Sequence, residues 1–388
     1  MDFESDLQLR KFVAPEFIFG LGALELAGRY AKNFGASRIL IVTDPGVMAA
    51  GWTDQAIENL ELEGLPHVLY SGVTPNPRAE EVMRGAEVYK NAGCNLILAV
   101  GGGSPMDCAK GIGIVSTNKK HILEFEGVDR VSIPMPPLIC IPTTGGTSAD
   151  VSQFAIISNP QEKIKIAIIS KAVVPDVALI DPHTLTTMDP YLAACTGLDA
   201  LVHAIEAYVS LAHSPITDLH ALAAIRLLCS HLLPSLAAPG NLQLRSQVML
   251  GSLEAGLAFS NASLGAVHAM AHSLGGLLDL PHGECNAILL EHVMSFNFPE
   301  APDRFSHIGE AMGLDLNKQN LSEKKAAILG EVMRLRKAVG IEQSLGQKGV
   351  QRTDIPELSQ KAMNDPCIVT NPRRPVRRDI EVIFEEAL

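Results

Sequence analysis

The stretch NLILAVGGGSPMDCAK, residues 95–110, indicates the fold class of the chain around it. NLILAV is typical of a short buried strand, three glycines follow it directly, and Ser104 with Pro105 are residues preferred at the N-cap and first position of a helix. A glycine turn between strand and helix lets the backbone approach a ligand, and the new helix offers free N–H groups to a phosphate. The pattern is neither GxGxxG nor GxxxxGK[ST], so an ordinary tight turn is the alternative.

The same alternation of apolar strands and helical patterns extends on both sides of this unit. Further buried strands are expected at residues 38–44, 67–73, 136–144 and 177–182. Continuous apolar runs rich in β-branched residues are typical of a parallel sheet that is buried on both faces. Residues 154–170 differ, because two apolar runs flank Asn159 and Pro160 and predict a hairpin.

Helical periodicity replaces this alternation after about residue 187 and continues almost to the carboxyl end. We therefore expect an α/β dinucleotide-binding domain at residues 1–187 and an all-α domain at residues 188–388. The length of 388 residues agrees with two domains, since a single core rarely grows beyond about 250–300 residues. Because ligands of open α/β sheets bind beyond the carboxyl ends of the strands, the active site is expected where the helical domain closes over that edge.

Composition and charge narrow the function classes. A formal net charge of −12 argues against nucleic acid and anionic membrane surfaces as partners. No run of 18 apolar residues and no apolar leader are visible, so neither a membrane span nor a signal peptide is expected. The seven cysteines show no CxxC spacing, which favours reduced thiols in a cytoplasmic protein.

Two further segments favour a dinucleotide beside the glycine turn. Asp44 ends the first expected strand, where a carboxylate accepts hydrogen bonds from ribose hydroxyls and repels a 2′-phosphate, which favours NAD over NADP. An N-cap before Pro45 explains Asp44 equally well. IPTTGGTSADVSQF, residues 141–154, supplies a second loop rich in Gly and Thr, whose hydroxyls either bind the cofactor or satisfy the loop backbone.

Five polar side chains in two apolar helical segments, 197–210 and 265–285, are candidates for metal chemistry. They are Asp199, His203, His268, His272 and His282. Residues four apart share one face of a helix, so Asp199 faces the same side as His203. A carboxylate with several imidazoles is a reasonable shell for a divalent transition metal. The alternative is a set of polar side chains that satisfy one another in a helical core.

With these segments in view, essentially the whole chain resembles the iron-containing (group III) alcohol dehydrogenase family. The matching motifs are GGGSPMDCAK, PTTGGTSADVSQF, PDVALIDP, TGLDALVHAIEAYVS, GAVHAMAHSLGG, LPHGECNAILL and DPCIVTNPRRP. The resemblance implies a dehydroquinate synthase-like two-domain architecture, NAD as cofactor, and one Fe²⁺ ion, although zinc accepts the same ligands.

The resemblance also implies roles for individual residues. The implied metal ligands are Asp199, His203, His268 and His282, and His272 is placed beside the nicotinamide and the substrate as a catalytic residue. The implied cofactor-binding residues are Asp44, Gly101, Gly102, Gly103, Ser104, Asp107, Thr143, Thr144, Thr147 and Lys165. The second loop departs from the family pattern AGTGSEVTRF at Asp150 and Gln153, which puts contacts near the substrate in doubt.

The predicted function is a metal-dependent alcohol dehydrogenase that transfers hydride reversibly between NAD and a small primary alcohol, diol or aldehyde. Three alternatives remain: a zinc-dependent polyol dehydrogenase, a dehydroquinate synthase-like lyase, and a catalytically silent protein that binds NAD and metal. A homodimer or higher homo-oligomer is expected, with the apolar segment FVAPEFIFG, residues 12–20, pairing across it.

Overall fold

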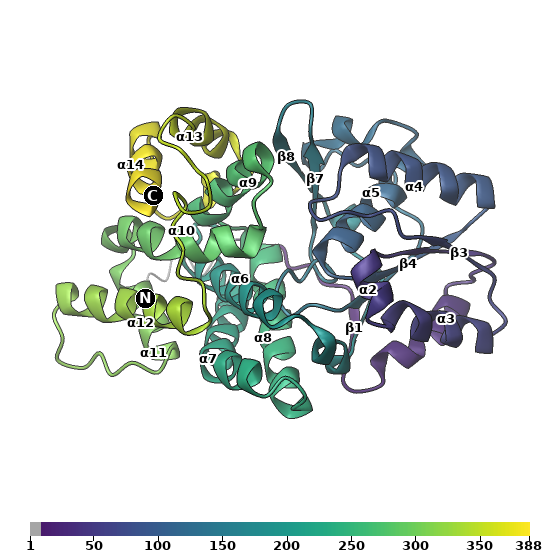
Figure 1. The fold of residues 1–388 in the computed structure, drawn as a ribbon, viewed down its shortest axis with the longest axis horizontal. Helices are drawn as coiled ribbons and strands as arrows, with labels where there is room; N and C mark the ends of the chain where they lie inside the picture. The colour runs from purple at the N-terminus through teal and green to yellow at the C-terminus, as the bar shows by residue number, and fades with distance from the viewer. Residues whose placement is uncertain (1–8) are drawn as a thin grey trace. The chain divides into compact units, whose positions relative to one another are not determined.

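The computed structural model describes residues 9–388, which form two compact units (Figure 1). The α/β unit consists of Val13–Met188 and Pro239–Met249, and the helical unit contains Asp189–Ala238 and Leu250–Leu388. The predicted fold class, a parallel α/β half and an all-helical half, is confirmed. The return of Pro239–Met249 to the α/β unit has no counterpart in the sequence pattern. The division into domains 1–187 and 188–388 stays a prediction.

The α/β unit is built on a six-stranded, wholly parallel sheet in the order β1-β9-β6-β4-β2-β3. Its strands are β1 (Glu16–Phe19), β2 (Ile39–Val42), β3 (His67–Tyr70), β4 (Leu96–Gly101), β6 (Leu138–Pro142) and β9 (Val177–Ile180). The four inner strands are buried at every position, because helices cover both faces of the sheet. The continuous apolar runs in the sequence follow from this double burial.

Two hydrophobic cores lie on opposite faces of this sheet, and β2 contributes to both. Ile39 and Ile41 pack toward one core, whereas Leu40 and Val42 pack toward the other. Figure 1 shows α2 and α3 on one side of the sheet and α4 and α5 on the other. The helices of this unit are η2 (Ala23–Leu26), α1 (Ala27–Asn33), α2 (Pro45–Ala49), α3 (Trp52–Leu62), α4 (Ala79–Ala92), α5 (Gly103–Asn118), η3 (Ile122–Phe125), η4 (Lys171–Val173) and η5 (Pro182–Thr187).

A smaller sheet in the order β5-β8-β7 contains the predicted hairpin. β7 (Phe154–Asn159) and β8 (Ile164–Ile169) pair antiparallel, which confirms the prediction from the two apolar runs. β5 (Gly127–Val128) pairs in parallel with β8. β1, inside the segment expected to pair across a dimer, is an edge strand that pairs in parallel with β9 of its own chain, and the expected pairing across a dimer stays a prediction.

The helical unit is centred on α6 (Pro190–Val209), which packs against α7 (Pro215–Ala237) and α10 (His282–Asn297). α9 (Ala266–Leu278) packs against α10 and α13 (Ile355–Asn364). The remaining helices are the part of α8 (Leu242–Ala262) that follows Met249, η6 (Phe298–Glu300), α11 (Pro302–Ala311), α12 (Leu321–Ala338), η7 (Pro366–Thr370) and α14 (Arg377–Ala387). This packing brings α6, α9 and α10 together, and these three helices carry the candidate metal ligands.

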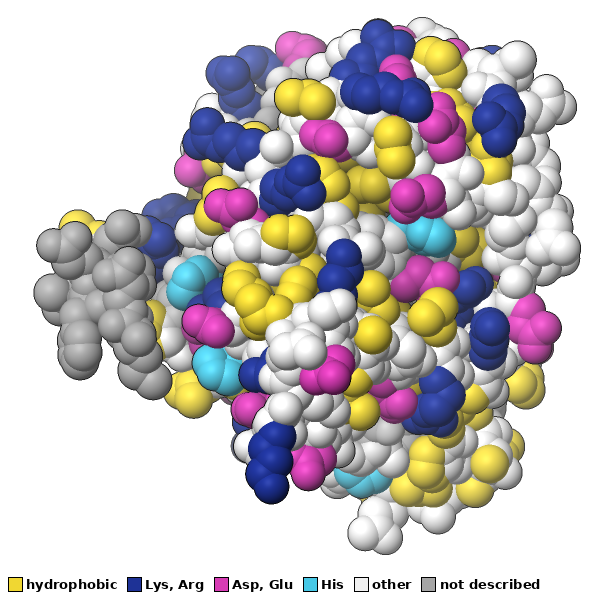
Figure 2. All heavy atoms as spheres, turned by 90° about the vertical axis from the view of Figure 1, so that its left-hand side faces the viewer, with side chains coloured by type: hydrophobic (Ala, Val, Ile, Leu, Met, Phe, Trp, Pro, Cys, Tyr) yellow, Lys and Arg dark blue, Asp and Glu magenta, His cyan; other side chains and the backbone are white. Residues whose placement is uncertain are grey.

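Within residues 9–388, two helices are long and apolar enough to cross a membrane by length and composition, although the sequence predicts no span. The apolar window of α6 is 89% buried, and that of α7 is 33% buried. A core helix passes the same test, so two such helices are weak evidence for a membrane protein. On the face of the molecule drawn in Figure 2, acidic and basic side chains are interspersed rather than gathered by sign.

Candidate metal centre and dinucleotide site

Helix α6 carries the first candidate ligands, and it is buried over most of its length. It begins after Asp189, whose side chain caps the N–H groups of Tyr191 and Leu192. All residues from 193 to 209 are buried, and Asp199 is only 2% exposed. A carboxylate so deeply buried is costly unless it pairs with a positive or hydrogen-bonding group.

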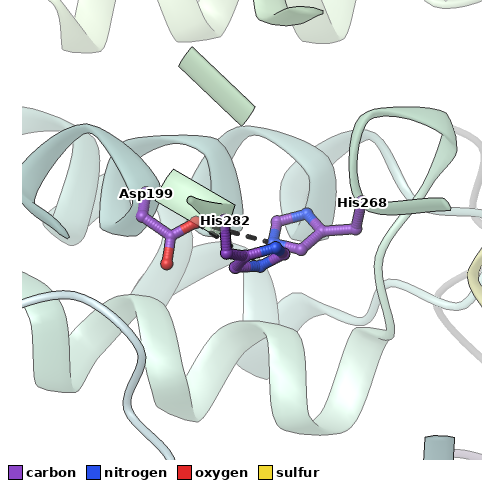
Figure 3. A group of neighbouring side chains, drawn as sticks. All are labelled: Asp199, His268 and His282. Atoms are coloured by element: carbon purple, nitrogen blue, oxygen red, sulfur yellow. Dashed lines mark ion pairs between the residues drawn. The ribbon is translucent and has the colours of Figure 1, made fainter. Parts of the chain in front are cut away.

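Asp199 meets two histidines from two other helices. Asp199 Oδ1 lies 3.8 Å from His268 Nε2 and 3.9 Å from His282 Nε2. The three atoms lie within 4.8 Å of one another, and Figure 3 shows the three side chains pointing toward a common centre. Lone pairs that converge in this way, from one carboxylate and two imidazoles, fit a divalent transition metal such as Fe²⁺ or Zn²⁺. We call Asp199 Oδ1, His268 Nε2 and His282 Nε2 the ligand triad.

His268 is held in the orientation that a ligand needs by Glu206, one helical turn beyond His203. Its Nδ1 lies 2.6 Å from Glu206 Oε2, and Glu206 Oε1 accepts the N–H of Val267 at 2.7 Å. Burial lowers the pKa of His268 to about 3, so the ring is neutral near pH 7. With its single proton donated from Nδ1 to the carboxylate, His268 presents the lone pair of Nε2 to the triad.

The remaining predicted ligand, His203, lies beside the triad rather than within it. Its ring stacks on His268 at a centroid distance of 4.5 Å and on Phe259 at 4.3 Å. Among the described residues, the convergent group at this point comprises only the three triad atoms. The assignment of His203 as a fourth ligand stays a prediction.

His272 lies one turn beyond His268 and has its own carboxylate partner. Its Nδ1 is 2.8 Å from Asp365 Oδ2, and its ring stacks on His282 at a centroid distance of 5.3 Å. Burial would raise the pKa of Asp365, but the pairing with His272 and the N–H of Cys367 outweigh it and hold that pKa below its ordinary value. An ionised carboxylate on Nδ1 fixes the tautomer of His272 and leaves Nε2 to exchange a proton.

In the α/β unit, the glycine turn and the threonine loop pack directly against each other. A Cβ placed on Gly102 would lie 3.0 Å from Thr144, and one on Gly103 would lie 3.1 Å from Thr147. Gly101 has a φ of 154°, which residues with a side chain rarely adopt. It ends β4, and its Cα lies beside the ring of Pro105. The two segments predicted to hold the dinucleotide are therefore neighbours, and a side chain at Gly102 or Gly103 would have to displace the threonine loop slightly.

The start of α5 differs from the prediction by two residues. Ser104 was expected at the N-cap, but Gly102 occupies that position and the helix begins at Gly103, so Ser104 lies inside the first turn. Glycine permits the earlier start because no Cβ meets the threonine loop. No side chain caps this helix start. Its first N–H groups therefore suit a phosphate.

A buried lysine ties the far end of the threonine loop to α5. Lys110 Nζ donates to the carbonyl oxygens of Ser152 at 3.0 Å and Phe154 at 2.7 Å. Thr143 is held at the near end, where its N–H donates to Gly101 O at 2.9 Å. Asp107 lies on α5 one turn before Lys110. These contacts fix the loop relative to the glycine turn.

The two departures from the family pattern, Asp150 and Gln153, are both buried. Burial raises the pKa of Asp150 to about 6. Near pH 7 a larger fraction of Asp150 is therefore protonated than of an exposed aspartate.

The remaining predicted cofactor residues have specific partners. Asp44 Oδ1 accepts the N–H of Val47 at 3.0 Å and so caps α2, as the alternative interpretation expects. A cap of this kind does not exclude contact of the carboxylate with a ribose. Lys165 Nζ lies 2.7 Å from Asn76 Oδ1.

Three of the residues in these contacts carry no assigned role in the sequence interpretation: Glu206, Asp365 and Asn76. Glu206 is the residue that the sequence could most readily have indicated, because a glutamate in an apolar helix near Asp199 and His203 requires a buried partner. Asp365 and Asn76 lie 93 and 89 positions from the residues they contact; Asp365 begins the motif DPCIVTNPRRP, but its spacing does not indicate which residue it contacts.

Comparisons with known proteins identify the family of the chain. The family model described as iron-containing alcohol dehydrogenase matches residues 14–182, and that of the C-terminal part of the Fe-containing alcohol dehydrogenase family matches residues 193–388. The chain is 40% identical over 373 residues to a 1,3-propanediol dehydrogenase of Citrobacter freundii, covering 95% of this chain and 96% of the relative. It is 33% identical over 377 residues to an NAD-dependent methanol dehydrogenase of Bacillus methanolicus, covering 97% and 99%. A solved 1,3-propanediol oxidoreductase superposes with a TM-score of 0.95 at 37% identity, covering 98% of this chain and 100% of that one.

Proposed function

Because the chain belongs to the iron-containing alcohol dehydrogenase family, we propose that it interconverts a small primary alcohol or diol and its aldehyde, with NAD as the hydride carrier. The observation that carries this proposal is the ligand triad, three lone pairs from three helices converging within 4.8 Å. The substrate class is supported by the relatives that act on 1,3-propanediol and methanol.

The proposed metal ligands are Asp199, His203, His268 and His282, and the proposed ion is Fe²⁺, with Zn²⁺ as the alternative that the same donors accept. A bound divalent ion supplies Lewis acidity to the alcohol oxygen. Burial keeps His268 neutral, and Glu206 orients it for this task. A single carboxylate among the ligands tightens retention of the ion but lowers the net charge of the site.

His272 is the proposed proton carrier. With Nδ1–H donated to Asp365, its Nε2 accepts the proton that leaves the substrate hydroxyl and passes it to solvent. The stacked ring of His282 fixes the plane of His272. Because His272 and His268 are on one helix face, a ligand-holding and a proton-carrying histidine lie one turn apart.

The cofactor is proposed to bind at the glycine turn of the α/β unit. Gly101, Gly102, Gly103 and Ser104 provide the close backbone and the helix start for the pyrophosphate, with Asp107 close by. Thr143, Thr144, Thr147 and Lys165 are assigned to the nicotinamide ribose, and Asp44 to the adenosine ribose. The cytoplasmic location and the homo-oligomer belong to the same proposal.

The experiment that tests this function is NADH formation on a short panel of alcohols and diols by anaerobically purified protein. The protein is assayed as isolated, after chelation, and after addition of Fe²⁺, Zn²⁺ or Mn²⁺. We expect activity to disappear on chelation, to return with one of the metals, and to be higher with NAD than with NADP.

Two outcomes would contradict the proposal. Rates that are high and indifferent to chelation would mean that the triad is only a set of core residues. Binding of metal and NAD without turnover on any substrate would favour the silent binding protein. Accumulation of NADH during turnover separates the dehydrogenase from a lyase that uses NAD transiently.

A further inference from the structure

One buried amide faces the ligand triad and takes no part in the proposed function. Asn286 lies on α10, one helical turn after His282, and is 0% exposed. Its Nδ2 lies 2.6 Å from Asp199 Oδ1, 3.1 Å from His268 Nε2 and 3.2 Å from His282 Nε2. These are the three atoms of the ligand triad. The carboxamide therefore borders the point on which the triad converges.

The hydrogen-bonding capacity of this amide does not match its surroundings. Nδ2 carries two protons and faces three acceptors, while Oδ1 has no hydrogen-bond partner among residues 9–388. A buried carbonyl oxygen without a partner is costly. The oxygen and nitrogen ends are nearly equal in size and exchange places by half a turn about the Cβ–Cγ bond, so either end fits either position.

A divalent ion at the convergence point decides between the two orientations. Its positive charge repels the N–H groups and attracts the carbonyl oxygen, which is the negative end of the amide dipole. In that orientation the oxygen gains the ion as a partner, and the N–H groups move to the position that the oxygen leaves. It also adds an oxygen ligand atom to the site without adding negative charge. A carboxylate at the same position would add a negative charge.

We propose that Asn286 is a residue of the metal site, with the oxygen of its carboxamide directed at the ion. This inference rests on the proposed function, because it requires that the triad holds a metal. It assigns a contribution to metal affinity to a side chain outside the set Asp199, His203, His268 and His282.

The test compares the wild-type protein with Asn286→Leu, which has nearly the same volume and no polar atoms. Affinity for Zn²⁺ is measured by competition with a chromophoric chelator, independently of turnover. We expect the affinity of Asn286→Leu to be lower than that of the wild type by about 10–100-fold, as for loss of a supporting group at a metal site. Asn297→Leu is the matched control, because it removes an equally buried amide from the same helix whose partner is Asn371. Its Zn²⁺ affinity should match that of the wild type.

A second variant keeps the test decisive if Asn286→Leu does not fold. Asn286→Asp places a carboxylate against Asp199, which repels it when no cation is present. We expect the melting temperature of this variant to be lower than that of the wild type in chelator, and to rise more than that of the wild type when Zn²⁺ is added.

The outcomes separate this inference from the proposed function. If Asn286→Leu binds Zn²⁺ as tightly as the wild type or more tightly, the amide only competes with the ion through its N–H groups, and the inference is wrong while the metal site stands. An Asn286→Asp variant that gains no more from Zn²⁺ than the wild type contradicts it in the same way. If the wild type itself binds no Zn²⁺ and no Fe²⁺, both the inference and the metal-dependent function fail.

Discussion

The ligand triad and the glycine turn are two candidate sites built in opposite ways. The triad joins side chains from α6, α9 and α10, and its members are paired with further buried groups such as Glu206 and Asn286. The glycine turn is one contiguous segment that works through backbone N–H groups and through the absence of side chains. A side-chain site is therefore lost by removing atoms, whereas a backbone site is lost by adding them.

The largest effect is expected from removing a triad member. His268→Ala should lose bound metal and lower kcat/KM by about a thousandfold or more, because the Lewis acid contributes several kcal/mol to the transition state. Metal content by elemental analysis and steady-state kinetics measure the two losses on the same preparation.

The control for this change is His272→Ala on the same helix. It should retain the metal and lower kcat by about 10²–10⁴-fold, as for loss of a general acid–base group. If His272→Ala removes the metal instead, the assignment of separate roles to the two histidines is wrong.

Adding atoms to the glycine turn should give a smaller effect that leaves the metal in place. Gly102→Val puts side-chain carbons where even a Cβ lies 3.0 Å from Thr144. Overpacking of this kind costs about 1–3 kcal/mol, so we expect KM for NAD to rise by about tenfold or more. The readouts are KM for NAD, NAD binding by calorimetry, and metal content. Loss of metal with unchanged NAD binding would contradict the separation of the two sites.

The smallest effect concerns Asp44, where a local cap and a cofactor contact compete as explanations. Asp44→Ala removes the cap on Val47 and should lower stability by about 0.5–2 kcal/mol. Asp44→Asn keeps a capping side chain but removes the charge. If the charge sets the cofactor preference, both variants should lower the ratio of kcat/KM for NAD to that for NADP, while only Asp44→Ala melts at a lower temperature. A ratio that changes in neither variant would leave Asp44 as a cap alone.

The parts of the fold that sequence predicts well are those whose signal is local. The buried strands, the β7–β8 hairpin and the strand–glycine–helix unit follow from runs of neighbouring residues. The pairing of β1 with β9 is not local, because a single apolar segment does not indicate which strand it pairs with, and the expected pairing of the same segment across a dimer stays a prediction. The start of α5 depends on how closely Thr144 and Thr147 approach, which no local pattern contains.

The sequence by itself determined the residue types of this protein's chemistry and their helical spacing: an aspartate and histidines at intervals of four, a glycine turn after a strand, and a threonine-rich loop. Only the tertiary structure decided which of these atoms converge and which groups orient them. Asp199 contacts Asn286 across 87 positions, and His272 contacts Asp365 across 93. The physical reason is that periodicity reports the face on which a side chain lies, whereas its partner depends on which buried faces of distant helices pack together.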